Sequence, residues 1–512
     1  MQRKSCFIGI VCFIGFCSLT NAEEILDREI ELPKTKETTY KLLNRISDLT
    51  GYFFIYDSDI INSEKKVNFP GGQYTVKQSI YLITQDPDIQ IKIVNRHILL
   101  YKTQMIPAVV VKSPPAMNDS LNFVVAHGIV KDAETKEPIP FVSASIAETG
   151  IGTITNQSGE FMLKIPVSDS KQDIQISHVG YNQQNIPVEL FLNNAVDVYM
   201  QTKIVPLQDV IIGISNPQKI IREMLNKRYI NYQNAPVYFT GFYREGIEKK
   251  NTVVSLTEAV LQIYKQGLES SSEDQVKLLK MRKITNTDVT DSFVLKMRAI
   301  IDASLRLDII KNIPDFLELD DDNPFNYTKI DMTVTDSSLA HVIAFEQKQG
   351  ITDPLYKGEL YIDADNSALL AAHFEFNPLY IEKATDIFVL KKPKGVDIKP
   401  ESANYYVYYK YWNGKYYLNH IRGDIIFKIK KKNAFFQPSK SIHTFFEMVV
   451  CKIDTTDVKR FSGKESISTR NVFSETKFQY DNRFWDDFNV ILPERELNEA
   501  ISRISSKIEE ME

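Results

Sequence analysis

The chain has 512 residues, which is enough for three or four domains of ordinary size. Its apolar content of 43% and charged content of 25% are ordinary for globular proteins, so each part can form a core. The formal net charge of -5 does not favour a nucleic-acid partner, because such proteins usually present a basic surface.

Residues 1–22 have the pattern of a secretory signal peptide. Arg3 and Lys4 supply the positive start, an apolar run over 6–19 follows, and small residues up to Ala22 offer a cleavage position. The apolar run is shorter than the roughly 20 residues that a membrane span needs. The sequence therefore predicts an exported protein rather than one retained by an N-terminal anchor.

The cysteines fit this interpretation. Three of the four lie in the leader: Cys6, Cys12 and Cys17. Bulky residues, Val11 and Phe16, precede the latter two, whereas a lipidated cysteine follows a small residue, so lipidation is not expected. Only Cys451 remains after cleavage, and its apolar neighbours predict a buried, unreactive thiol and no internal disulfide.

A small α+β domain is predicted over 24–103, with the element order β-α-β-β-α-β-β. Thr38 precedes the first helical pattern, Gly51 ends it, and Thr75 caps the second. The segment 28–102 resembles the short N-terminal (STN) domain of secretins and TonB-linked receptors, and these ranges support the resemblance: 39–51, 54–57, 74–80 and 98–100. The resemblance implies a periplasmic docking module without catalytic residues, which binds an envelope protein and has a possible contact with the TonB system.

Prolines and polar residues over 104–123 predict a linker, after which short alternating strands with Gly, Pro and Asn turns predict a β-sandwich over 124–202. Gly159 suits a turn that needs a positive φ, and Phe161 and Tyr181 are the expected core anchors. The segment resembles the carboxypeptidase-D regulatory-like domain, of transthyretin-like fold, and these ranges support the resemblance: 128–130, 138–142, 152–156, 159–161 and 177–181.

This resemblance does not imply peptidase activity. A zinc carboxypeptidase needs a His-x-x-Glu pair and a distant histidine, and none of the seven histidines has a glutamate three residues later. His178 is interpreted as a packed strand residue. The order of the two modules resembles envelope proteins of the Bacteroidetes type.

Residues 203–217 are predicted to be a second linker. The segment 206–213 resembles the extended segment of TonB-linked receptors that pairs with TonB by strand addition, although the exit strand or linker of the sandwich is the favoured interpretation. Asn216 and Pro217 then open an amphipathic helix.

A large antiparallel β-rich domain with peripheral helices is predicted over 218–512. An aromatic strand pair covers 237–264, a helix is expected near 294–310, and a terminal helix is expected over 495–511. Asn413 and Gly414 give a two-residue hairpin signal. From 327 a run of strands is expected: 329–335, 341–347, 358–363, 369–377, 405–412, 416–421, 424–430 and 441–451.

Such a meander should roll into a curved sheet or a partial barrel. Residues 358–363 give it a loose resemblance to periplasmic lipoprotein-carrier half-barrels, which implies an apolar concave face for a lipid-like ligand. The charged end of the chain argues against an outer-membrane barrel.

No catalytic, cofactor or metal motif is recognised. His443 and Glu447 share one strand face but lack a third ligand, and the Asp363–Asp365 pair flanks an expected turn. Aromatic residues over 405–412 could stack on sugar rings, although a core role is favoured.

The hypothesis is a multi-domain, mainly β, non-catalytic binding or adaptor protein without a cofactor. We expect it in the periplasm, associated with the outer membrane and linked to TonB-type nutrient uptake or signalling, with a possible glycan or lipid-like ligand in 218–512. Two alternatives remain open: a hydrolase of envelope glycan or peptide with an unrecognised site in 218–512, and a structural role at the cell surface.

Overall fold

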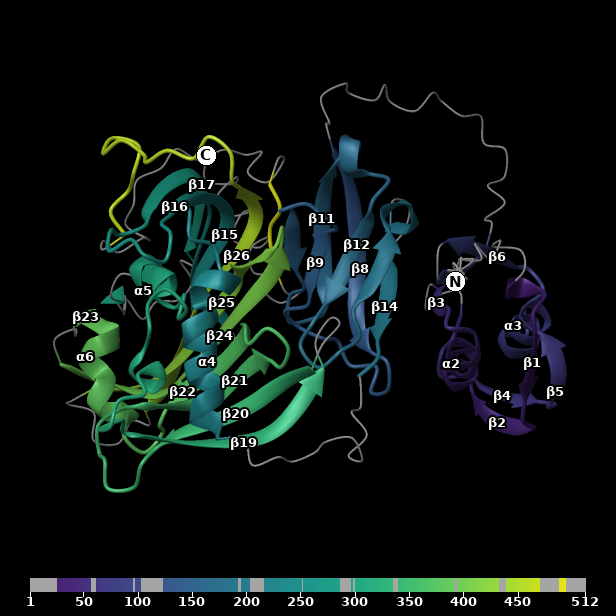
Figure 1. Cartoon of the computed structure of the whole chain (residues 1–512), viewed down its shortest axis with the longest axis horizontal. Coiled ribbons are helices and arrows are strands. Elements are labelled where there is room, and N and C mark those ends of the chain that lie inside the picture. The colour runs from purple at the N-terminus through teal and green to yellow at the C-terminus, as the bar shows by residue number, and fades with distance from the viewer. Residues whose placement is uncertain are drawn as a thin grey trace, which may run out of the picture. The chain divides into compact units, whose positions relative to one another are not determined.

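A computed structural model describes most of the chain (Figure 1). The described residues are 25–56, 61–94, 97–102, 123–191, 195–202, 216–250, 252–285, 296–297, 300–334, 339–391, 395–431, 439–469 and 488–493. Four predicted segments lie outside them, wholly or almost wholly: the leader 1–22, the linker 104–123, the segment 206–213 and the terminal helix 495–511. The chain divides into two compact units, 1–114 and 115–512.

The first unit is the predicted α+β domain. Its elements are β1 (Glu29–Leu32), β2 (Thr35–Thr38), α2 (Thr39–Thr50), β3 (Phe53–Tyr56), β4 (Lys66–Phe69), β5 (Gly72–Thr75), α3 (Val76–Thr84), β6 (Ile89–Val94) and β7 (His97–Lys102). They form the sheets β1-β5, β2-β4 and β3-β7-β6. The strands β2 and β5 were not predicted. Each is only four residues long and leads directly into a helix cap, so its strand pattern is too short to recognise in the sequence.

The helix caps follow the sequence signals. The Thr38 side chain accepts from the Lys41 N–H, and Gly51 ends α2 at a φ of 75° with its N–H donated to the Ser47 carbonyl. Thr75 and Gln78 form a reciprocal capping box on α3. The apolar faces of α2 and α3 meet in the core of this unit.

The second unit begins with a β-sandwich of seven strands: β8 (Phe123–Asp132), β9 (Ser143–Ile146), β10 (Gly152–Ile154), β11 (Glu160–Pro166), β12 (Asp173–Ser177), β13 (Gln184–Pro187) and β14 (Val196–Met200). One sheet has the order β10-β9-β12-β13, and the other β11-β8-β14. Gly159 has a φ of 74°, as the turn requires, and Phe161 is buried. Tyr181 differs from the expectation: it is only half-buried, and its hydroxyl donates to Asp132 Oδ2 at 3.0 Å.

An open ten-stranded antiparallel sheet dominates the rest of the unit. Its strands are β15 (Val237–Lys249), β16 (Thr252–Lys265), β17 (Gln275–Thr285), β19 (Phe325–Val334), β20 (Leu339–Gln347), β21 (Tyr356–Asp363), β22 (Leu369–Phe376), β24 (Val396–Trp412), β25 (Lys415–Lys431) and β26 (Lys440–Asp454). The order is β17-β16-β15-β26-β25-β24-β22-β21-β20-β19, so the last strand in sequence lies between β15 and β25. Asn413 and Gly414, with φ of 47° and 78°, form the predicted turn between β24 and β25.

Helices cover one face of this sheet (Figure 1). They are α4 (Pro217–Asn231), α5 (Ile300–Arg306) and α6 (Thr385–Phe388). Side chains from these helices and the sheet form one apolar core, in which Phe316 stacks on Phe345 at 4.4 Å between ring centroids. The face that was expected to hold a lipid-like ligand is therefore packed with the protein's own side chains. None of the helices in the described ranges is long and apolar enough to cross a membrane.

Three details of this domain differ from the prediction. The expected helix near 294–310 is limited to α5, after the short strand β18 (Lys296–Met297), which pairs with β23 (Val389–Lys391). Strand β17 was not predicted. The expected strands 416–421 and 424–430 are one strand, β25, which pairs with β24 and β26 without interruption at Gly423. The ring of Phe446 packs over Gly423, where a Cβ would lie 2.3 Å from the Phe446 Cε1.

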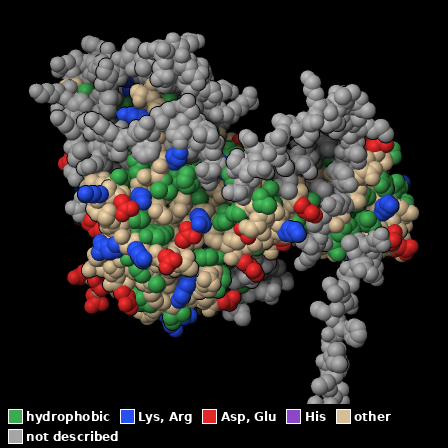
Figure 2. Space-filling view, turned by 90° about the horizontal axis from the view of Figure 1, so that it is seen from above, with side chains coloured by type: hydrophobic (Ala, Val, Ile, Leu, Met, Phe, Trp, Pro, Cys, Tyr) green, Lys and Arg blue, Asp and Glu red, His purple; other side chains and the backbone are tan. Residues whose placement is uncertain are grey.

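Acidic and basic side chains are interspersed over the described surface that Figure 2 presents. This mixture agrees with the small net charge of the chain.

Candidate binding pocket between the sandwich and the sheet

The sandwich packs on the sheet face opposite the helices. Gly150, at the β9–β10 turn, accepts a hydrogen bond from the Ile453 N–H of β26 at 3.2 Å. The backbones approach so closely that a Cβ on Gly150 would lie 2.7 Å from the Ile453 carbonyl oxygen. The Trp412 indole of β24 donates to the Glu148 carbonyl at 3.3 Å. The sandwich and the sheet are therefore joined by direct backbone contacts.

The segment 488–493 bridges the same two parts. The Asn489 side chain exchanges hydrogen bonds with the Lys164 backbone of β11, and the Val490 carbonyl accepts from the Thr153 hydroxyl of β10. The Asn489 carbonyl also accepts from the Cys451 thiol at 3.2 Å. The Cys451 thiol is buried, as predicted, and this burial raises its pKa to about 12, which disfavours the reactive thiolate.

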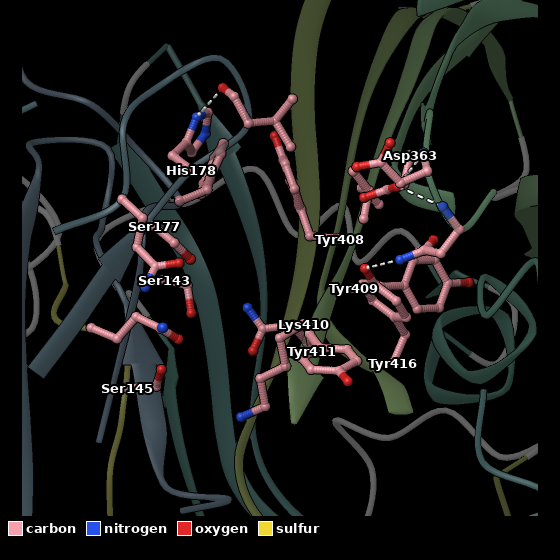
Figure 3. Close-up of a pocket in the computed structure, with 18 residues that line it drawn as sticks. Ser143, Ser145, Ser177, His178, Asp363, Tyr408, Tyr409, Lys410, Tyr411 and Tyr416 are labelled. Carbon is pink, nitrogen blue, oxygen red and sulfur yellow. Dashed lines mark hydrogen bonds between the residues drawn. The ribbon is translucent and has the colours of Figure 1, made fainter. Parts of the chain in front are cut away.

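A pocket of about 400 Å³ lies at this junction (Figure 3). Ser143, Ser145, Ser177 and His178 of the sandwich stand on one side, and Asp363, Tyr409 and Tyr416 stand on the other. The remaining lining residues are Phe141, Gln175, Val179, Gln183, Asp365, Asn366, Leu370, Tyr408, Lys410, Tyr411 and Asn419. The lining is thus a mixture of hydroxyl, amide and aromatic groups.

Strand alternation places the polar groups on the sandwich side. Ser145 pairs with Gln175 and Ser143 with Ser177 across β9 and β12, and all four line the pocket. The intervening residues, Ala144 and Ile176 among them, are buried in the sandwich core. This arrangement offers a row of neutral hydrogen-bonding groups to a ligand.

The aromatic residues of β24 divide between the two faces of the sheet. Tyr405 and Tyr409 belong to the apolar core, as favoured from the sequence, although Tyr409 also borders the pocket. Tyr408 packs toward the sandwich with its ring 5.9 Å from that of His178. The core role favoured for this run is wrong for Tyr411, which is 59% exposed, lines the pocket and presents a ring that a ligand can reach.

Histidines surround Tyr408 behind the pocket wall. The Tyr408 hydroxyl is hydrogen-bonded to His373 Nε2 at 2.8 Å, and its ring stacks on that of His420. Burial lowers the pKa of His178, and burial together with His178 lowers the pKa of His373 to about 4. His178, interpreted from the sequence as a packed strand residue, instead lies just after β12, which ends at Ser177. It is a neutral contact between the sandwich and the sheet.

The backbone at Phe141 is strained beside the pocket. This residue has a φ of 62°, which is uncommon for a side chain larger than glycine. Its ring lies 5.0 Å from that of His420 and 6.0 Å from that of Tyr406. Strained residues of this kind concentrate at binding and catalytic sites.

The carboxylates of the pocket belong to one turn. Asp363 Oδ1 accepts from the backbone N–H groups of Asp365 and Asn366, as the predicted turn requires. Asp365, the second carboxylate of the lining, is exposed. Both carboxylates thus come from one turn of the sheet domain, and the described sandwich side of the lining carries none.

His443 and Glu447 share one face of β26, as predicted, but belong to different ion pairs. His443 contacts Glu248 at 3.0 Å and Asp424 at 2.9 Å, whereas Glu447 contacts His420 at 2.9 Å. Within the described ranges no group of three His, Cys, Asp or Glu side chains has the placement of a metal site.

The His443 ion pairs predict pH-dependent stability. Partial burial would lower the pKa of His443, but the Asp424 and Glu248 hydrogen bonds outweigh it and raise the pKa to about 9. Because its pKa is raised on folding, protonated His443 stabilises the folded state. This contribution is fully present below the pKa of about 6.5 that histidine has in the unfolded chain, and it is lost as the pH rises through about 9. We expect His443→Gln to lower the free energy of unfolding by on the order of 1–3 kcal/mol at pH 6 and by much less at pH 9.5. Urea denaturation of both proteins at the two pH values measures this, and an equal loss at both would contradict it.

Residues 126–212 match the family model described as the CarboxypepD_reg-like domain. This segment is a carboxypeptidase-D regulatory-like domain. The match confirms the resemblance found in the sequence and runs beyond the predicted boundary at 202. The regulatory-like domain therefore contributes one side of the pocket, from Phe141 to Gln183. The STN resemblance, the Bacteroidetes type and the domain boundaries stay predictions.

The search of curated proteins gave no match. Among solved structures, one described as "Lipid-protein interactions in lipovitellin" is 8% identical to this chain, with a TM-score of 0.23. The similarity covers 46% of this chain and 27% of the lipovitellin chain. A DUF1329 family protein from Desulfovibrio piger is 11% identical over 48% of this chain and 96% of its own, with a TM-score of 0.20. A LolA superfamily protein from Nitrosomonas europaea is 10% identical over 46% of this chain and 94% of its own, with a TM-score of 0.15. TM-scores this low do not establish a shared fold.

Most of this pocket was not predicted from the sequence. Its sandwich side comes from small polar residues, Ser143, Ser145 and Ser177, whose alternation is also that of an ordinary exposed strand. Lys410 lies in the aromatic run that was considered for sugar stacking, but nothing in that run shows which residues would meet the sandwich. Only the packing of two distant segments brings these residues together.

Proposed function

We propose that this protein is a non-catalytic binding protein of the bacterial cell envelope, and that the pocket beside the regulatory-like domain holds a hydroxyl-rich ligand such as a short glycan. The observation that supports it best is the lining of the pocket, which has a volume of about 400 Å³. Serine hydroxyls and glutamine amides on one side of this pocket face tyrosine rings on the other. Ligand sites combine apolar or aromatic walls with a few placed polar groups, and they favour domain junctions. A sugar ring offers both an apolar face and a rim of hydroxyls.

The rest of the proposal concerns the setting of this site. The leader-like segment 1–22 supports export to the periplasm, and the STN-like domain over 24–103 supports docking to an envelope protein at the outer membrane, linked to TonB-type uptake or signalling. A lipid-like ligand is less well supported, since the helix-covered face of the sheet is filled by Phe316 and its neighbours.

Glycan binding and Tyr411 together test the site. The purified chain is expected to bind members of a panel of immobilised neutral and acidic oligosaccharides, without cleaving them. Tyr411→Ala removes the exposed ring, so affinity should fall about tenfold, or about 1.4 kcal/mol. Tyr229→Ala is the matched control, because Tyr229 is 38% exposed on α4 and lies outside the pocket lining. Absence of any binding, equal losses in both variants, or hydrolysis of a bound glycan would overturn the proposal.

A further inference from the structure

We infer that the ligand of this pocket is a saccharide with an anionic group, such as a uronic acid, and that Lys410 binds this group. The inference rests on the proposed function, since it assumes that the pocket is the ligand site, and it adds the charge of the ligand.

Lys410 is the one cationic side chain among the described lining residues, because His178, the other basic residue there, is neutral. It projects from β24 beside Tyr411, into the junction with the sandwich (Figure 3). Its Nζ donates to the Gly150 carbonyl at 3.5 Å, which is at the outer limit of a hydrogen bond. Within the described ranges it forms no ion pair.

An ammonium group carries three N–H donors, and burying these donors without hydrogen-bond acceptors costs free energy. Lys410 is partly buried, and this burial lowers the pKa of its ammonium to about 8, so it is still largely protonated at neutral pH. A single long contact to Gly150 does not satisfy these donors. A ligand carboxylate would supply both a negative counter-charge for the Lys410 ammonium and strong hydrogen-bond acceptors for its N–H groups.

The two acidic residues of the lining do not oppose such a ligand strongly. Asp363 Oδ1 is turned toward the N–H groups of its own turn, and Asp365 is exposed, where solvent and salt screen its charge. Near Lys410 the sandwich presents Ser143 and Ser145, which are neutral donors and acceptors for sugar hydroxyls. The cation therefore has hydroxyl-binding groups beside it, as recognition of an acidic sugar requires.

The experiment compares matched ligands with matched variants. Each acidic oligosaccharide of the panel is measured by calorimetry as the free acid and as its methyl ester, which removes the charge and keeps the sugar. The free acids should bind about tenfold or more tightly than the esters. Lys410→Gln should abolish this preference, whereas Lys410→Arg should retain it. Lys452→Gln is the control, since it removes a charge of the same sign from an exposed residue that does not line the pocket.

The two ways of failing are distinguishable. If esters and acids bind equally, or if Lys410→Gln keeps the preference, the inference is wrong, while binding that depends on Tyr411 leaves the proposed function standing. If nothing binds, the proposed function fails first, and the inference with it. Should Lys410→Gln unfold, the ester comparison on the unmodified protein still decides the outcome.

Discussion

Replacing Glu258 with glutamine is expected to lower the free energy of unfolding by about 3–5 kcal/mol, because it removes the carboxylate that pairs with the buried Arg244 and the half-buried Arg282. Glu258 on β16 is fully buried, and its two oxygens contact Arg244 at 2.7 Å and Arg282 at 2.5 Å. Arg244 is 1% exposed and also donates to the Ile491 carbonyl. Glutamine keeps the shape of the side chain, so the loss reports the charge rather than a cavity.

A matched control separates this effect from the loss of any carboxylate. Glu375→Gln breaks the Lys357–Glu375 pair, whose side chains are 41% and 30% exposed, and should cost less than about 1 kcal/mol. Urea denaturation followed by circular dichroism measures both changes. Similar small losses would show that Arg244 is held by other groups, such as Glu447 across the strand pair.

Lys265→Met is the second substitution with a large expected effect, again about 3–5 kcal/mol. The Lys265 ammonium is 3% exposed and lies 2.9 Å from Asp274 and 2.8 Å from Asp308. Burial would lower the pKa of Lys265, but Asp308 and Asp274 raise it above its usual range. Methionine fits the same space and leaves two buried carboxylates, of which Asp274 keeps a partner in Lys311.

Removing a carboxylate as well should restore part of the loss. We expect the double variant Lys265→Met, Asp308→Asn to be more stable than Lys265→Met alone, because the neutral amide can still meet the Tyr409 hydroxyl that now donates to Asp308 at 2.9 Å. The four proteins of this double-mutant cycle are compared by urea denaturation. Strictly additive losses would contradict a direct coupling between Lys265 and Asp308.

Local signals predicted most of the elements but little of the pocket. Caps at Thr38, Gly51 and Thr75 and the Asn413-Gly414 turn depend on neighbouring residues, and the structure confirms them. The missed strand β17 and the shortened helix α5 lie in 266–325, where alternation is weak and tertiary packing decides. The pocket joins residues 141–183 to 363–419, and no local pattern predicts that contact.

The same distinction explains the aromatic run over 405–412. Period-two alternation places Tyr405 and Tyr409 on one face of the sheet and Tyr406 and Tyr408 on the other. It does not show that one face meets helices and the other a sandwich. Glu258, Arg244 and Glu447 are cross-strand neighbours on three adjacent strands. Charged residues of this kind usually face solvent, yet all three are buried.

The position of β26 has a consequence for biosynthesis. This strand enters between β15 and β25, and its residue Asp454 pairs with Tyr238, so the sheet unites only after more than two hundred further residues have been made. Until then β15 and β25 each offer an open edge, which can recruit a strand from another molecule. Contacts so distant in sequence slow folding, so the nascent domain should depend on holding chaperones while its central strand is still to come.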